Sequence, residues 1–215
     1  MPRARARPEA PAYVSRGGDK LAGALDTFGI DVAGRRALDA GASTGGFTDC
    51  LLQRGARRVI AADVAYGQLA WRLRIDERVR VVERANVRSI DLPSIAEAAV
   101  DLVVADLSFI SLRTVRDALL AASVPGAELI LLVKPQFEAP RERVPRGGVV
   151  RDRATMRESM RAVADSYRAA GCGLLGAAES PLTGPKGNRE FFLHLRRGAA
   201  DAGDDTIERS VAEVS

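Results

Sequence analysis

Apolar residues along this chain fall into two repeating patterns. Short runs that are apolar at nearly every position have the length of buried strands. They alternate with longer stretches in which apolar residues recur every three or four positions, as in amphipathic helices. The predicted strands are residues 36–40, 57–63, 79–83, 100–106, 128–134, 172–179 and 189–196. The predicted helices are residues 20–28, 47–54, 68–74, 112–121 and a long helix, capped by Asp152, that runs to about residue 170.

This order of elements predicts the fold class. Strands that alternate with helices imply a parallel sheet with right-handed crossovers, and therefore a doubly wound α/β domain. The last two predicted strands follow each other without a helix, so we expect an antiparallel hairpin at one edge of a mostly parallel sheet. The domain is predicted to span residues 12–197, between a flexible Arg-rich tail at 1–11 and an acidic, disordered tail at 198–215.

Composition excludes several classes of protein. The chain has 215 residues, of which 47% are hydrophobic and 28% charged, so it can bury a core. Its longest apolar runs, such as residues 129–133, are far shorter than the roughly 20 residues of a membrane span. The amino-terminal arginines precede no apolar stretch, which argues against a secretory signal. Two cysteines, Cys50 and Cys172, without a CxxC pair favour a reducing cytoplasm and suggest no metal site.

Charge is unevenly distributed along the chain. The net charge is +4, with +2 in residues 1–11, +6 in residues 12–197 and −4 in residues 198–215. A basic body is compatible with a nucleic-acid partner because basic side chains neutralise phosphates, although the arginine bias of a GC-rich genome gives the same composition. Only three of the 32 basic residues are lysines, namely Lys20, Lys134 and Lys186, so each is a candidate for chemistry.

The sequence LDAGASTGGFTD follows a predicted strand and opens a helix, where backbone N–H groups can face a ligand. A dinucleotide fingerprint would have glycines at positions 41, 43 and 46, but Ser43 stands in the middle and Gly45 is added. No Lys-Ser/Thr pair follows, as a Walker motif would require. The carboxylate of Asp39, just before the loop, suits a ligand with a cationic group. S-adenosylmethionine, which carries an ammonium and a sulfonium, fits that description.

Asp63 ends the next predicted strand, 22 residues after Gly41. A carboxylate there can accept hydrogen bonds from a ribose diol, a feature that enzymes with nicotinamide cofactors share. It therefore supports an adenosine ligand without naming it. The alternative for both Asp39 and Asp63 is capping of the strand ends.

Two further strand ends carry candidates for an acceptor site, because ligands of open α/β sheets lie beyond the carboxyl ends of the strands. Asp106 lies in ADLSFIS and Lys134 in LLVKPQFE. The Asn/Asp-Pro-Pro-aromatic signature of amino-directed methyltransferases is absent. A lysine after five apolar residues is a candidate general base for a hydroxyl group, because burial favours its neutral amine. A structural ion pair between Lys134 and Asp106 is an equally good interpretation.

Several longer motifs resemble a known family. SRGGDKL, LDAGASTGGFTD, AADVAYGQLAW, VVADLSFISL, LVKPQFE, GGVVRD and SPLTGPKGNREFFL occur in the order found in the TlyA-type methyltransferases of the FtsJ/RrmJ-like class, many of which are labelled hemolysin A. The resemblance covers about residues 12–197. It implies a Rossmann-like class I methyltransferase with a seven-stranded sheet. Such an enzyme uses S-adenosylmethionine to methylate the 2′-hydroxyl of cytidine in ribosomal RNA.

The resemblance also implies the site residues. The family's Lys-Asp-Lys-Glu tetrad falls on Lys20, Asp106, Lys134 and Glu190. Lys134 would take the hydroxyl proton, Asp106 would orient it, Lys20 would help fix the ribose and Glu190 would balance the charge. Implied cofactor contacts are Asp39, Gly41, Ser43, Gly45, Gly46 and Phe47 near the methionine, Asp63 at the ribose, Asn86 near the adenine, and Asp106. No metal is implied.

Two departures from the family leave the substrate open. The family's amino-terminal RNA-binding module is not seen ahead of these motifs, which start within about 15 residues of Met1. Three alternatives follow: the catalytic domain methylates RNA weakly by itself, a docking partner replaces the module, or the substrate is a small hydroxyl-bearing metabolite. The loop after Glu138 is rich in arginine and proline. Four of its basic side chains are candidates to bind phosphates, and the alternative is a solvated surface loop: Arg141, Arg143, Arg146 and Arg151. Alternatives are a methyltransferase of small-molecule hydroxyls and a non-catalytic, hemolysin-labelled binding protein.

Aromatic residues and the single histidine receive structural interpretations. His194 is predicted to be a strand residue, and Cys50 and Cys172 small core residues. Tyr66 and Trp71 flank the short helix after Asp63, where packing is favoured over covering the adenine.

Overall fold

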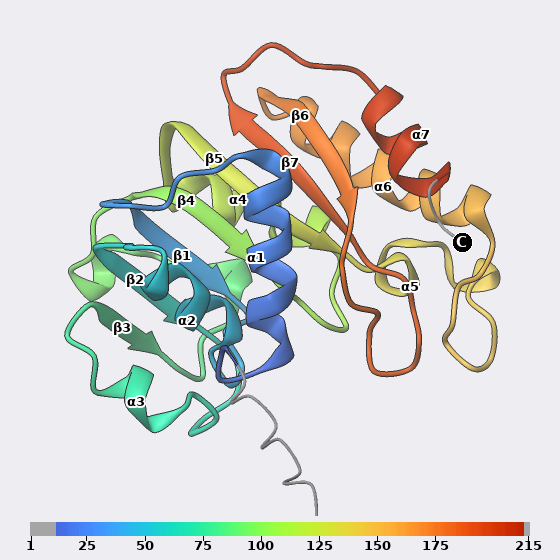
Figure 1. Cartoon of the computed structure of the whole chain (residues 1–215). Coiled ribbons are helices and arrows are strands. Elements are labelled where there is room, and N and C mark those ends of the chain that lie inside the picture. The colour runs from blue at the N-terminus through green and yellow to red at the C-terminus, as the bar shows by residue number, and fades with distance from the viewer. Residues whose placement is uncertain (1–11, 213–215) are drawn as a thin grey trace, which may run out of the picture.

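A computed structural model describes residues 12–212 and contains one seven-stranded sheet in the order β3-β2-β1-β4-β5-β7-β6 (Figure 1). The strands are β1 (Arg36–Ala40), β2 (Arg58–Ala62), β3 (Val79–Val82), β4 (Val100–Ala105), β5 (Ser123–Val133), β6 (Cys172–Glu179) and β7 (Phe191–Arg197). The α-helices are α1 (Arg16–Phe28), α2 (Gly46–Gln53), α3 (Trp71–Arg74), α4 (Leu112–Ala121), α5 (Pro135–Glu138), α6 (Arg153–Arg168) and α7 (Asp205–Ala212). Three short 3-10 turns are η1 (Val87–Ser89), η2 (Pro93–Ile95) and η3 (Arg141–Arg143).

Strand directions confirm the predicted fold class. β1 to β5 pair in parallel, and β7 runs antiparallel between β5 and β6. The chain moves outward from β1 to β2 and β3, and then returns to place β4 on the other side of β1. A crevice forms at such a reversal of strand order, because the flanking loops separate there.

Helices cover both faces of the sheet. Alternate residues of a strand point to opposite faces, so in β1 Ala37 belongs to one hydrophobic core and Leu38 to the other. The first core packs α1 and α2 against the sheet, with α1 lying across the front of the molecule in Figure 1. The second core packs α4, α6 and α7 against the opposite face. The Asp152 side chain accepts hydrogen bonds from two backbone N–H groups at the start of α6, which confirms the predicted cap.

The acidic segment after residue 197 differs from its prediction as a disordered tail. It contains the helix α7, in which Ile207 and Val211 are fully buried in the second core. The prediction was wrong for this part because it weighed the small and acidic residues and overlooked two apolar residues four positions apart. The predicted tail at residues 1–11 lies outside the described residues, as do residues 213–215.

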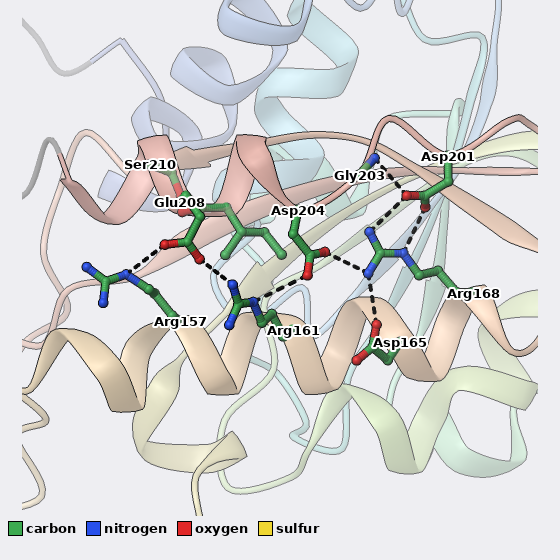
Figure 2. A network of polar contacts seen from close by, with 10 residues as sticks. Arg157, Arg161, Asp165, Arg168, Asp201, Gly203, Asp204, Glu208 and Ser210 are labelled. Atoms are coloured by element: carbon green, nitrogen blue, oxygen red, sulfur yellow. Dashed lines mark hydrogen bonds and ion pairs between the residues drawn. The ribbon is translucent and has the colours of Figure 1, made fainter.

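Acidic residues around α7 face a row of arginines on α6 (Figure 2). Glu208 pairs with Arg157 and with Arg161 at 3.2 and 2.7 Å, and Asp204 contacts Arg161 at 3.3 Å. Asp204 and Asp201 both pair with Arg168, each at 2.8 Å. The charges at the carboxyl-terminal end of the chain therefore neutralise arginines of the domain itself.

Element boundaries differ modestly from the predictions. α1 begins at Arg16 rather than at residue 20, α3 begins only at Trp71, and β5 starts at Ser123, five residues earlier than expected. The early part of β5 pairs only through a bulge, where Val100 lies opposite Ser123 and Leu102 opposite Glu128. An irregular strand segment of this kind has no period-2 pattern to reveal it.

Candidate active site

The loop between β1 and α2 has a shape that depends on glycine. Gly41 has a φ of 89°, and a Cβ there would lie 2.5 Å from the carbonyl oxygen of Asp106. Gly45 has a φ of 98°, and its Cβ would lie 2.3 Å from the Leu73 side chain. Side chains rarely adopt this left-handed conformation, and here they would also collide. The Gly41 N–H donates to the Ala62 carbonyl at 2.8 Å, so the loop is fixed between the ends of β2 and β4.

Asp63, directly after β2, is held by two backbone donors. The Ser43 N–H donates to its Oδ2 at 2.7 Å, and the Ala65 N–H donates to its Oδ1 at 2.8 Å. Ser43 itself has a φ of 48°, which is uncommon for a residue with a side chain. The glycine loop and the end of β2 are thus tied together through one carboxylate.

A cavity of about 410 Å³ opens beside these groups. Five of the nine residues predicted to contact a cofactor line it: Gly41, Ser43, Asp63, Asn86 and Asp106. Val64, Val87 and Ile110 add apolar wall. The Asn86 side chain also caps η1 by accepting from the Arg88 N–H at 3.0 Å. We call this space the cofactor cavity, because it lies at the strand-order reversal where such folds bind nucleotides.

The other four predicted cofactor residues lie beneath the loop: Asp39, Gly45, Gly46 and Phe47. Phe47 is buried and packs on Phe192, with ring centroids 6.2 Å apart. Gly46 lies where α1 crosses α2, and a Cβ there would be 2.8 Å from the backbone nitrogen of Gly18. None of the four lines the cofactor cavity, so their contact with a cofactor stays a prediction. Their burial indicates that they also shape the loop and the helix crossing.

Asp39 is a fully buried carboxylate on β1. Its Oδ2 accepts a hydrogen bond from the Thr48 hydroxyl at 2.6 Å, whereas its Oδ1 has no partner. Burial raises the pKa of Asp39 to about 7; the Thr48 hydrogen bond opposes this rise and the charge of Asp106 adds to it. Because this pKa is close to physiological pH, Asp39 is only partly ionised in the folded protein.

The four residues of the predicted tetrad form two ion pairs. Lys134 Nζ lies 2.6 Å from Asp106 Oδ1, and Lys20 Nζ lies 2.5 Å from Glu190 Oε2. The antiparallel register of β5 and β7 sets Val133 opposite Phe191, so the neighbouring residues Lys134 and Glu190 meet at the ends of these strands. Lys20 comes from α1, which the close helix crossing at Gly46 brings against the sheet. The structure thus assembles all four side chains, and the ion pair of Lys134 with Asp106 is present.

A second cavity, of about 480 Å³, adjoins the first. Ser108 and Phe109 line both cavities, Asp106 lines the first, and Lys134 and Glu190 line the second. The Lys134 ammonium donates to the Ser108 hydroxyl at 3.1 Å. The Lys134–Asp106 pair therefore lies at the junction of two cavities. We call the second space the acceptor cavity.

Phe109 is a site residue that the sequence analysis missed. Its side chain is 91% exposed, its φ is 64°, and its ring lies 5.1 Å from that of Phe137. A bulky residue with positive φ is strained, and such strain is concentrated at ligand sites. The available signal was a large aromatic residue among polar ones, directly after the strand that ends in Asp106.

The arginine-rich loop after α5 borders the acceptor cavity. Arg143 forms an ion pair with Glu158, so this side chain is engaged within the protein. The other three candidate phosphate-binding residues are exposed: Arg141, Arg146 and Arg151. Asn188 fixes the end of the loop, because its side chain accepts from the Val150 N–H at 3.0 Å and donates to the Gly148 carbonyl at 2.8 Å.

The histidine, the two cysteines and the two aromatic residues that were predicted to have structural roles lie in different environments. His194 lies on β7, with its Nε2 3.2 Å from Glu128 Oε1, as expected for a strand residue. Cys50 and Cys172 are buried free thiols, as predicted. Tyr66 and Trp71 are 68% and 71% exposed, so the packing favoured for them is not in the core; the Arg84 guanidinium lies 4.4 Å from the centroid of the Tyr66 ring. The loop before α3 and its first turn face outward, where these rings meet solvent; neither ring lines the cofactor cavity.

Comparison with known proteins now decides the family. The model of the family described as FtsJ-like methyltransferase matches residues 13–197. The chain belongs to this methyltransferase family. It is 53% identical to the 16S/23S rRNA (cytidine-2'-O)-methyltransferase TlyA of Mycobacterium tuberculosis, over 94% of this chain and 77% of that protein. It is 44% identical to YqxC of Bacillus subtilis, provisionally named an rRNA methyltransferase, over 94% and 72% of the two chains.

A solved structure has the same fold. A Lactococcus lactis protein provisionally named a hemolysin superposes with a TM-score of 0.90 and 40% identity, covering 95% of this chain and 99% of that one. No helix within residues 12–212 is long and apolar enough to cross a bilayer. Residues 12–212 also contain no group of three or more His, Cys, Asp or Glu side chains arranged for a metal ion.

Proposed function

We propose that this protein uses S-adenosylmethionine to methylate the ribose 2′-hydroxyl of a cytidine in ribosomal RNA. The observation that carries the proposal is the Lys134–Asp106 ion pair at the junction of the two cavities. A group transfer between two ligands requires both to approach the same point. The similarity to an rRNA cytidine methyltransferase at 53% identity supports the substrate class. Such a substrate also favours a cytoplasmic location.

The cofactor cavity fits S-adenosylmethionine by its chemistry. The Asp63 carboxylate, fixed by Ser43 and Ala65, is suited to the ribose diol, and the apolar wall at Val64 and Val87 is suited to the adenine. Asp106, which pairs with Lys134 at the junction, also lines this cavity, and its carboxylate favours the cationic sulfonium. When bound, S-adenosylmethionine supplies an electrophilic methyl group. Gly41, which also lines this cavity, lets the loop lie close against the end of β4, because a Cβ at this position would collide with the Asp106 carbonyl oxygen.

The tetrad then positions and deprotonates the acceptor. Asp106 and Ser108 hold the Lys134 amine at the edge of the acceptor cavity. In our proposal Lys134, in its neutral form, takes the proton of the ribose 2′-hydroxyl, and Asp106 orients that hydroxyl. Lys20 and Glu190, a buried pair beside this group, fix the ribose and balance the charge. Phe109 offers an exposed aromatic face on which a base can stack.

Labelled methyl transfer tests the proposal. Wild-type protein is incubated with labelled S-adenosylmethionine and either unmethylated ribosomal subunits or their extracted RNA. We expect label in RNA at a linkage that resists alkaline cleavage, which identifies 2′-O-methylation and its position. Cofactor binding without label in either substrate would contradict an RNA substrate and favour a small-molecule hydroxyl.

Lys134→Ala is the companion variant. We expect it to bind S-adenosylmethionine with wild-type affinity by calorimetry and to transfer methyl roughly 10²–10⁴-fold more slowly, the usual contribution of a general base. Lys134→Arg keeps the positive charge but cannot act as a base at neutral pH. If Lys134→Arg transferred methyl at the wild-type rate, Lys134 would act through its positive charge and not as a proton acceptor.

A further inference from the structure

Lys134 contacts two side chains at the junction of the cavities, and the two contacts differ in kind. Its Nζ lies 2.6 Å from Asp106 Oδ1, but this oxygen makes no contact with hydrogen-bond geometry among residues 12–212. The contact with the Ser108 hydroxyl, at 3.1 Å, does have that geometry. Charge attraction depends on distance, whereas a hydrogen bond weakens steeply when it is bent. Asp106 therefore fixes where the amine lies, and Ser108 fixes how it is turned.

The direction of the amine decides whether Lys134 can act as a base. A neutral amine has two N–H groups and one lone pair, and only the lone pair takes up a proton. If the amine turned freely, the lone pair would face Asp106 or Ser108 for part of the time. With one N–H held by Ser108 and the other drawn to the Asp106 carboxylate, the lone pair takes the remaining direction.

The segment that carries Ser108 is tied to the turn that begins at Lys134. The Ser111 hydroxyl and the Leu112 N–H donate to the Glu138 carboxylate at 2.5 and 2.7 Å. Glu138 is buried and ends α5, whose N-cap is Lys134. One carboxylate thus joins the two segments, and such support preorganises the contact between Lys134 and Ser108.

We propose that Ser108 is a positioning residue of the transfer reaction, which turns the lone pair of Lys134 toward the acceptor hydroxyl. This inference rests on the proposed function. Ser108 is exposed and lines both cavities, and Lys134 lines the acceptor cavity. The proton moves from the 2′-oxygen to the Lys134 nitrogen, and the oxygen bonds to the methyl carbon. The electron pair of the broken carbon–sulfur bond stays on sulfur, and Ser108 forms and breaks no covalent bond.

Nuclear magnetic resonance tests the orientation of the amine without any substrate. The chain has three lysines, so protein with ¹³C-labelled lysine gives three Cε signals, and Lys134→Arg identifies the signal of Lys134. We expect a higher order parameter for this Cε in the wild type and in Ser108→Thr, which keeps the hydroxyl, than in Ser108→Ala. Ser94→Ala is the matched control, because the exposed Ser94 hydroxyl also makes one hydrogen bond and lines neither cavity.

Single-turnover methyl transfer to ribosomal RNA tests the consequence for the reaction. Ser108→Ala should bind S-adenosylmethionine and RNA as the wild type does, but transfer methyl roughly 10- to 100-fold more slowly, the range for one hydrogen bond to a group that becomes charged. Ser108→Thr and Ser94→Ala should transfer at nearly the wild-type rate. Ser108→Ala added to Lys134→Ala should cause no further loss, because Ser108 acts only through Lys134.

Each contrary outcome has a distinct meaning. An order parameter of Lys134 that is unchanged in Ser108→Ala shows that another group orients the amine, and transfer by this variant at the wild-type rate shows that the orientation has no effect on the reaction. An equal loss from Ser108→Ala in the Lys134→Ala background shows that Ser108 acts on a ligand directly. These three outcomes overturn the proposal while the RNA methyltransferase activity stands. Wild-type protein that binds the cofactor but labels no RNA contradicts the proposed function, and with it the role of Ser108 in that reaction.

Discussion

At the scale of single residues, burial decides chemistry that residue type leaves open. Asp39 and Asp63 both follow apolar strand residues and have the same carboxylate. Asp63 receives two backbone hydrogen bonds at the cavity, whereas Asp39 is sealed beneath the loop with one oxygen unpartnered. The first is equipped to bind a ligand. The second is a buried acid whose pKa is raised to about 7, mainly by desolvation.

Asp39 makes the stability of the protein depend on pH. Its pKa is about 7 in the folded protein against an ordinary value of 3.8, so between these values the folded state holds a proton that the unfolded state has lost. Asp39 therefore does not lower the free energy of unfolding below about pH 4, and it lowers this free energy increasingly as the pH rises toward 7. Between pH 4.5 and 8, the free energy of unfolding of the wild type should fall by roughly 2–4 kcal/mol relative to that of Asp39→Asn, which cannot ionise.

Urea unfolding at several pH values measures this difference. Asp91→Asn, at an exposed position, is the control and should follow the wild-type curve. Parallel curves for wild type and Asp39→Asn would show that Asp39 is ionised in the folded protein throughout this range.

At the scale of elements, apolar contacts rather than charges explain why α7 is folded. Ile207 and Val211 are fully buried, whereas Arg161 and its partners Asp204 and Glu208 remain partly exposed. Exposed ion pairs contribute little because water screens them. The charge pattern that suggested a disordered tail therefore describes only the outer side of this helix.

Ile207→Ala tests the role of that buried face. We expect a loss of about 2–4 kcal/mol in the free energy of unfolding, typical of removing a large buried aliphatic side chain. Arg161→Ala should cost less, and the exposed Asp205→Ala should stay within about 0.5 kcal/mol of wild type. Chemical denaturation measures all three. Equal stability of Ile207→Ala and wild type would show that α7 is not packed in solution.

At the scale of the whole molecule, the location of unneutralised charge matters more than net charge. Arginines of α6 are paired with the acidic residues around α7. The loop arginines at 141, 146 and 151 are exposed, and Val144 and Gly148 of the same loop line the acceptor cavity. A net charge of +4 therefore understates how strongly the cavity side of the molecule can attract phosphates.

The salt dependence of RNA binding tests this distribution. Replacing Arg141, Arg146 and Arg151 together with alanine should weaken binding and reduce the slope of log K against log salt by up to roughly 2, at about 0.7 for each phosphate that is no longer neutralised. Replacing the paired Arg157 and Arg161 should leave the slope nearly unchanged. Binding measured at several salt concentrations would contradict the assignment if the two sets of replacements had equal effects.

The sequence by itself determined the order of elements, the doubly wound sheet with its hairpin and the glycine loop. These depend on periodicity and motifs within short segments, which local conformation reflects directly. Only the tertiary structure decided that Asp39 is sealed from the cavity, that α7 packs, that Phe109 stands exposed between two cavities and that Ser108 accepts a hydrogen bond from Lys134. Each of these depends on contacts between segments far apart in the chain, and burial and hydrogen-bond partners are set by such contacts.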